Sequence, residues 1–313
     1  MNLIGKNQHK NALLAVLWKA TRPRTFPLAA ASIICGNGLA YHALNGFDLT
    51  HWCIFLLTLW VALCLQILSN LANDYGDGVS GADNLRDAQS PERITVTGQI
   101  NANDLKKVIY YWGAFTFFCG VLLIYLGLET LNEFLVFLSL GILAIIAACA
   151  YTMGKRPYGY RALGEASVLM FFGWLGVLGS CYLQLHYLEG GMILPATGCG
   201  LLSAGVLYVN NMRDIDSDKL AKKTTIAVLL GKQTMALGYY VIILLAMMCY
   251  FAYARFNSLG SLLWLLVLPF ILKHLIFVYN NRNNPQQLGT QLKTVVMSTL
   301  AVNLLFVVGL LLI

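Results

Sequence analysis

The segment that decides the fold covers residues 51–78 and reads HWCIFLLTLWVALCLQILSNLANDYGDG. Its apolar part has about the 20 residues that a helix needs to cross a lipid bilayer. The run ends in a polar cluster that contains Asn70, Asn73, Asp74 and Asp77. Carboxylates beside hydrocarbon are energetically costly and usually mark function. The segment therefore predicts a membrane helix with a functional site at one end.

The composition extends this interpretation to the whole chain. Of its 313 residues, 58% are hydrophobic and only 11% are charged, and the mean hydropathy is +0.67. These values exclude an ordinary soluble domain. We expect an all-α, polytopic membrane protein with a single domain over residues 1–313 and about nine transmembrane helices. The predicted spans are 25–44, 51–72, 108–128, 134–153, 164–186, 193–212, 234–254, 259–280 and 294–313.

The basic residues indicate the orientation. If the N-terminus is cytoplasmic, 20 of the 21 Lys and Arg residues lie in or beside cytoplasmic segments, and only Arg255 does not. Such a split follows the positive-inside rule. We therefore expect the N-terminus and the active-site loops to face the cytoplasm. The net charge of +7 reflects the membrane topology, because the basic residues lie in short segments between the spans. We therefore expect no nucleic-acid partner.

A second acidic cluster follows the predicted span 193–212. In a helix, Asp214 and Asp218 share one face, as do Asn73 and Asp77 in the first cluster. Asp216 points elsewhere and is expected to be solvated. Mg²⁺ takes one or two protein carboxylates and completes its shell with water and phosphate oxygens. Each cluster alone also fits an ordinary helix end, but two clusters on one side of the membrane favour a magnesium and diphosphate site.

Basic residues near these clusters are candidate anion ligands, although each also fits a topology anchor. Lys155 is favoured because Tyr151 lies four residues earlier, on the same face if the helix continues. Charge-assisted hydrogen bonds from such groups suit a diphosphate. The other candidates are Arg22, Arg24, Arg93, Arg156, Lys222 and Lys223.

The motifs resemble those of the UbiA-type intramembrane aromatic prenyltransferases. In that superfamily NDxxDxxxD follows the second span and DxxxD the sixth. Asn73 to Asp77 match the start of the first motif, Asp214 to Asp218 match the second, and Tyr151 to Lys155 match the family's YxxxK. The last Asp of the long motif falls on Gly81, and Asp83 lies two residues further on.

Three stretches are most similar to the 1,4-dihydroxy-2-naphthoate polyprenyltransferases: residues 68–77, 154–161 and 213–218. The resemblance implies a helical bundle around a central cavity in the bacterial inner membrane, with polyprenyl diphosphate, the naphthoate and membrane lipid as partners. It implies Mg²⁺ as cofactor and demethylmenaquinone as product, with loss of CO₂. The implied metal ligands are Asn73, Asp77, Asp214 and Asp218. The implied catalytic residues are Asp74, Tyr151 and Lys155. The implied substrate-binding residues are Asn70, Arg22, Arg24, Arg93, Arg156, Lys222 and Lys223.

Two alternatives remain at this stage. One is another member of the superfamily that acts on 4-hydroxybenzoate or haem. The other is a cation-coupled transporter, for which acidic residues within the spans and broken helices would be expected. The predicted spans have no Asp or Glu at their centres, which disfavours transport.

Overall fold

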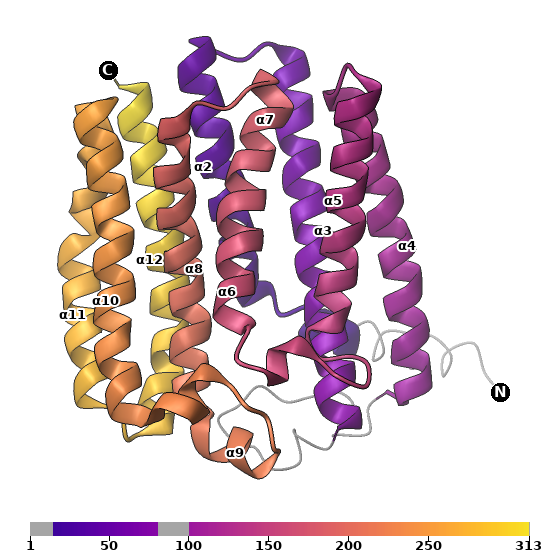
Figure 1. The fold of residues 1–313 in the computed structure, drawn as a ribbon, viewed down its shortest axis with the longest axis vertical. Coiled ribbons are helices and arrows are strands. Elements are labelled where there is room, and N and C mark those ends of the chain that lie inside the picture. Colours follow the sequence, from indigo (N-terminus) through magenta and orange to yellow (C-terminus); the bar gives the residue numbers. More distant parts are fainter. Residues whose placement is uncertain (1–14, 81–99, 313) are drawn as a thin grey trace.

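The computed structural model describes residues 15–80 and 100–312, so Gly81, Asp83 and Arg93 lie outside the described part of the chain. Within that part the chain forms a bundle of long helices (Figure 1). The described residues form no β-strand, and their one β-bridge joins Arg161 to Thr224. The predicted all-α architecture is confirmed.

Each predicted span has a helical counterpart. Uninterrupted helices are α2 (Phe26–Leu44), α3 (Leu49–Val79), α4 (Ala102–Gly127), α5 (Leu131–Ala150), α8 (Ile193–Arg213) and α12 (Pro285–Leu311). Helix α10 (Ile226–Phe256) is kinked at Gly231, where φ is 75°. Two spans consist of more than one helical segment. In the first, α6 (Gly164–Val168) continues through the π-helix η4 (Leu169–Leu178) into α7 (Gly179–Leu185). In the second, the 3₁₀-helix η6 (Leu259–Val267) continues into α11 (Leu268–Asn280). Short elements are η1 (Pro23–Thr25), η3 (Tyr158–Tyr160), η5 (Gly190–Met192) and α9 (Ile215–Leu220).

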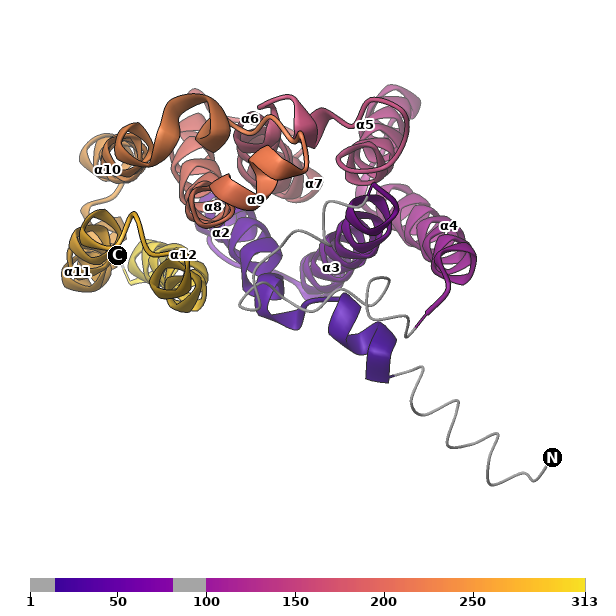
Figure 2. The ribbon, with the colours of Figure 1, turned by 90° about the horizontal axis from the view of Figure 1, so that it is seen from below.

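The number of spans is close to the prediction of about nine. Among the described residues, eight helices are long and apolar enough to cross a membrane, and α2 is not one of them. Helix α2 has 19 residues, and its interior includes Asn37, which lowers its hydropathy. Asn37 is buried and accepts a hydrogen bond of 2.7 Å from Gln184 of α7. Seen from the end of the bundle, α2 lies between α3, α8 and α12 (Figure 2).

Local sequence signals set several helix starts. Thr130 and Glu133 form a reciprocal capping box at the start of α5. Thr225 caps α10 through the Val228 N–H, and Pro285 occupies the first turn of α12. Thr130 and Thr225 satisfy backbone N–H groups of the first turn that would otherwise have no partner, and Pro285 has no N–H group to satisfy.

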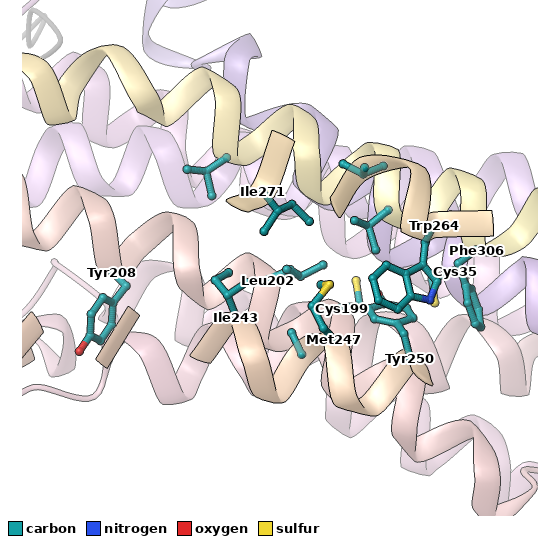
Figure 3. Close-up of a cluster of buried hydrophobic side chains, with 14 of the residues drawn as sticks. Cys35, Cys199, Leu202, Tyr208, Ile243, Met247, Tyr250, Trp264, Ile271 and Phe306 are labelled. Carbon is teal, nitrogen blue, oxygen red and sulfur yellow. The ribbon is translucent and has the colours of Figure 1, made fainter. Parts of the chain in front are cut away.

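The largest core joins α2, α8, α10 and α12 with the η6–α11 segment. Tyr250 of α10, Phe306 of α12 and Trp264 of η6 pack together there, against Cys199 of α8 (Figure 3). Tyr250 also donates a hydrogen bond of 2.7 Å to Asn303. This half of the bundle is therefore closely packed, whereas α3, α4 and α5 form its other side (Figure 2).

Two helix ends differ from the prediction. Helix α3 continues to Val79, beyond the predicted end at 72, so the first cluster is helical and Asn73 and Asp77 share a face. Helix α5 ends at Ala150, before the predicted 153, and Gly154 has a φ of 97°. Tyr151 and Lys155 therefore do not share a helical face, and that part of the prediction is wrong.

Gly76 is the point of closest approach between α3 and the segment after α5. A Cβ atom there would overlap the backbone oxygen of Thr152 and would lie 2.6 Å from its carbonyl carbon. We expect Gly76→Ala to destabilise the fold by about 1–3 kcal/mol, the usual cost of overpacking. Thermal unfolding in detergent measures this.

The matched control for that prediction is Gly113→Ala in α4, where the nearest side-chain atom would be 3.8 Å away, an ordinary contact. We expect this variant to melt within a few degrees of the unsubstituted protein. Equal melting temperatures for the two variants would contradict the close approach at Gly76.

Candidate active site

A cavity of about 510 Å³ lies among α2, α3, α4, α5, η4, α8 and α12. Its body is apolar and includes Phe117, Val121, Leu138, Phe171 and Leu175. Its other end is polar and is lined by Arg22, Arg24, Asn70, Asn73, Asp77, Tyr151, Asn210, Asn211, Arg213, Lys223 and Lys293. One space therefore joins a charged mouth to an apolar chamber.

The first cluster occupies the last two turns of α3. Asp77 is 2% exposed and accepts a hydrogen bond of 2.8 Å from the Tyr160 hydroxyl. Asn73 Oδ1 accepts a bond of 3.2 Å from the Thr152 hydroxyl. Both residues line the cavity. The helix thus aims an amide oxygen and a carboxylate, one turn apart, at the mouth.

Two further residues of this cluster hold the N-terminal segment. Asp74 is buried and forms an ion pair with Arg22. Asn70 donates hydrogen bonds of 2.8 Å to the Thr21 carbonyl and 3.0 Å to the Thr25 hydroxyl. These contacts fix η1, and with it Arg22 and Arg24, at the cavity mouth.

The second cluster lies where α8 ends and α9 begins. Asp214 is buried and pairs with Arg213, whose Nε lies 2.6 Å from Asp214 Oδ1. The Asp218 N–H donates to the Asp214 carbonyl at 2.8 Å, which keeps the two residues one turn apart. Lys223 Nζ lies 3.7 Å from Asp218 Oδ1. Asp214 and Asp218 are thus buried beside the cavity, behind Arg213 and Lys223, which line it.

Asp216 behaves as the sequence indicated. Its side chain is 66% exposed and pairs with Lys232 at 2.7 Å. It points away from Asp214 and Asp218, although it lies between them in the sequence.

Tyr160 connects the two clusters. Its hydroxyl donates to Asp77 of α3, and its ring lies 5.3 Å below the Lys223 ammonium, which in turn pairs with Asp218. Sequence reasoning quoted the stretch 154–161 but did not identify this residue. The aromatic ring and the ammonium attract each other as a cation–π pair, so Tyr160 links α3 to the segment after α9.

The basic candidates separate into two groups. Arg22, Arg24 and Lys223 line the cavity, whereas Lys155, Arg156 and Lys222 are exposed and do not line it. The prediction that favoured Lys155 depended on a helical continuation, but α5 ends at Ala150. Arg213 and Lys293 also line the cavity and were not identified from the sequence. No general sequence signal distinguishes them from the other basic residues at span ends.

The cations at the mouth lie close to one another. Partial burial, and then the guanidinium groups of Arg22 and Arg213, lower the pKa of Arg24. Like charges in a confined space repel each other, and a bound anion relieves that repulsion. An anion bound at the mouth would therefore add to the neutralisation that Asp74 gives Arg22 and Asp214 gives Arg213.

Tyr151 lies at the same end. Burial, followed by the carboxylates of Glu165 and Asp77, raises the pKa of Tyr151, so the phenol keeps its proton at neutral pH. As a protonated phenol, Tyr151 can donate a hydrogen bond to a ligand.

The donor set fits Mg²⁺. No group of three or more His, Cys, Asp and Glu residues that could hold a metal occurs within residues 15–80 and 100–312. Each cluster instead contains two hard oxygen donors: Asn73 and Asp77, which line the cavity, and Asp214 and Asp218, which lie beside it and are paired with Arg213 and Lys223. This is the share that proteins usually contribute to a Mg²⁺ ion whose remaining ligands are phosphate and water.

The fold and the site define a multi-pass membrane protein whose cavity combines an acidic and basic mouth with an apolar chamber. Residues 14–309 match the UbiA prenyltransferase family. The chain therefore belongs to the UbiA prenyltransferase family and is a membrane prenyltransferase.

Curated relatives extend over nearly the whole chain. A 1,4-dihydroxy-2-naphthoate octaprenyltransferase of Haemophilus influenzae is 41% identical over 304 residues, which cover 96% of this chain and 97% of the relative. The Escherichia coli protein of the same name is 43% identical over 294 residues and 93% of each chain.

A solved structure supports the fold. A UbiA homologue from Archaeoglobus fulgidus bound to GPP and Mg²⁺ superimposes with a TM-score of 0.63 at 14% identity, covering 94% of this chain and 99% of that one.

Proposed function

We propose that this protein transfers a polyprenyl group from polyprenyl diphosphate to 1,4-dihydroxy-2-naphthoate with loss of CO₂, giving the hydroquinone form of demethylmenaquinone. The observation that carries the proposal is the single cavity whose mouth gathers cations and hard oxygen donors while its body is apolar. A polyprenyl diphosphate is divided in the same way, into a charged diphosphate and an apolar chain. The relatives named 1,4-dihydroxy-2-naphthoate octaprenyltransferase, at 41% and 43% identity, favour the naphthoate as acceptor.

The mouth holds the diphosphate and the acceptor carboxylate. Lys223 and Arg213 line the cavity beside Asp218 and Asp214, where they can donate charge-assisted hydrogen bonds to diphosphate oxygens. Arg22 and Arg24 reach the mouth from the N-terminal side. They are the remaining cations for the acceptor carboxylate, together with Lys293.

Mg²⁺ held by Asn73, Asp77, Asp214 and Asp218 would supply the Lewis acid that stabilises charge on the leaving diphosphate. The residues of the mouth keep the diphosphate in place while its C–O bond to the prenyl group breaks. A carbon of the electron-rich naphthoate ring then bonds to the allylic carbon, and the ring carboxylate leaves as CO₂. The apolar walls around Phe117, Phe171 and Leu175 exclude the water that would otherwise capture the allylic cation.

We further propose that the mouth faces the cytoplasm, in the inner membrane of a bacterium. The positive-inside distribution of Lys and Arg supports this orientation. Both clusters lie at the same end of the bundle as α9 (Figure 1), so the soluble diphosphate product would leave on the cytoplasmic side.

A membrane assay tests reaction, acceptor and metal together. We expect 1,4-dihydroxy-2-naphthoate and polyprenyl diphosphate to give the prenylated naphthohydroquinone, which air oxidises to the naphthoquinone during extraction. EDTA should remove at least about 99% of the activity because the leaving group is then unneutralised, and excess Mg²⁺ should restore it. Product is measured by chromatography. Prenylation of 4-hydroxybenzoate alone would overturn the acceptor, and full activity in EDTA would overturn the metal.

A further inference from the structure

Five carboxylates are buried among the described residues. Four of them, Asp74, Asp77, Asp214 and Asp218, belong to the two clusters. The fifth is Glu165, which lies in the first turn of α6 and is 7% exposed. An ionised carboxylate is costly to bury without partners, and the mechanism above gives Glu165 no role.

Glu165 has one strong hydrogen bond. Its Oε1 accepts from Nδ2 of Asn211 at 2.8 Å, and its Oε2 is buried with no partner among residues 15–80 and 100–312. Lys223 and Tyr151, which line the cavity, lie near enough to interact with it electrostatically. Glu165 therefore lies directly behind the cavity wall.

The carboxylate determines which way the Asn211 amide points. In the structure the NH₂ end of Asn211 donates to Glu165, so the amide oxygen faces away, which is the orientation that an ionised carboxylate requires because it only accepts hydrogen bonds. Asn211 lines the cavity. In the described part of the chain its Oδ1 accepts no hydrogen bond and is not among the enclosed oxygen atoms. The pair thus presents a polarised hydrogen-bond acceptor to the ligand space.

We propose that Glu165 is a positioning residue that orients Asn211 so that Asn211 Oδ1 accepts a hydrogen bond from the C4 hydroxyl of the naphthoate acceptor. This inference rests on the proposed function. The hydroxyl at C1 is adjacent to the ring carboxylate and bonds to it internally, which leaves the C4 hydroxyl for the protein. A hydrogen bond from the C4 hydroxyl to Asn211 Oδ1 would position the ring and raise its electron density. It adds no covalent step to the reaction.

Equilibrium binding of two unreactive analogues to purified full-length protein tests the pair. The analogues are 4-hydroxy-2-naphthoate and 2-naphthoate, which differ only in the hydroxyl. We expect the unsubstituted protein to prefer the hydroxylated analogue by about tenfold, the worth of one hydrogen bond. In Glu165→Gln the new amide can donate or accept, so the orientation of Asn211 is lost and the preference should fall to within about twofold.

Three controls make the result specific. Glu165→Gln should bind 2-naphthoate and melt as the unsubstituted protein does, because it is nearly isosteric. Asn211→Leu should lose the preference, and adding Glu165→Gln to it should change nothing more, since Glu165 acts through Asn211. Glu189→Gln, in the exposed connection between α7 and α8, should keep the preference.

A tenfold preference that survives Glu165→Gln would overturn the inference, as would equal binding of both analogues by the unsubstituted protein. The prenylation assay separates these results from failure of the proposed function. If the unsubstituted protein forms prenylated product and Glu165→Gln keeps the tenfold preference, only the role of Glu165 is wrong. If Glu165→Gln loses the preference but the unsubstituted protein does not turn over the naphthoate, the proposed reaction is wrong.

Discussion

Asp77→Asn and Asp218→Asn are each expected to lower kcat by about a thousandfold, which corresponds to about 4 kcal/mol of transition-state stabilisation. Both carboxylates are 2% exposed and belong to separate clusters: Asp77 lines the cavity mouth, and Asp218 is buried beside it, paired with Lys223. Asparagine keeps the shape and a hydrogen-bond acceptor for Tyr160 or Lys223 but removes the negative charge that holds a divalent cation. Initial rates of naphthoate prenylation at saturating Mg²⁺ measure the loss.

Asp216→Asn is the matched control. Asp216 lies in the same short helix as Asp218, but its side chain is exposed and pairs with Lys232. We expect this variant to keep at least half of the activity, because exposed ion pairs contribute little. Activity within tenfold of the unsubstituted protein in either Asp77→Asn or Asp218→Asn would sink the metal-ligand assignment.

Lys223→Met is expected to lower kcat/KM for polyprenyl diphosphate by about a hundredfold, or about 2.7 kcal/mol. Lys223 is 6% exposed, lies 3.7 Å from Asp218, and its ammonium sits over the Tyr160 ring. Methionine fills a similar volume without the charge, so the variant removes the contact with the diphosphate together with the ion pair to Asp218 and the cation–π contact to Tyr160. Steady-state kinetics with varied polyprenyl diphosphate measure it.

Lys222→Met, one residue earlier, provides the comparison. Lys222 is exposed and does not line the cavity. We expect less than a twofold change in kcat/KM. If the two lysine variants were equally impaired, a general change in surface charge would explain the result, and Lys223 would lose its assigned contact.

The sequence was sufficient for the location of the membrane helices. Every predicted span has a helix in the structure, because a bilayer demands long apolar segments whose backbone groups are paired internally. The two acidic clusters were found for a related reason: carboxylates at the ends of apolar runs are rare. The i,i+4 relation of Asn73 and Asp77 followed from helical geometry once α3 continued through them.

Helical continuation was also the source of the error at Lys155. The apolar pattern fades gradually at the end of α5, whereas the turn at Gly154 lies between Thr152, which packs against Gly76, and Gly159, which packs against Tyr151. Gly159, for example, approaches the Tyr151 backbone oxygen so closely that a Cβ there would lie 2.7 Å from it. Such contacts between distant segments leave no periodic signal in the sequence.

The sequence by itself determined that this protein is a helical membrane protein and which ends of its helices carry acidic groups, because hydropathy and charge act locally along the chain. Only the tertiary structure decided which side chains meet. It placed Tyr160 between Asp77 and Lys223, set Glu165 behind Asn211, and separated buried Lys223 from exposed Lys222. These relations depend on packing between α3, α6, α8 and the segment after α9, which are far apart in the sequence.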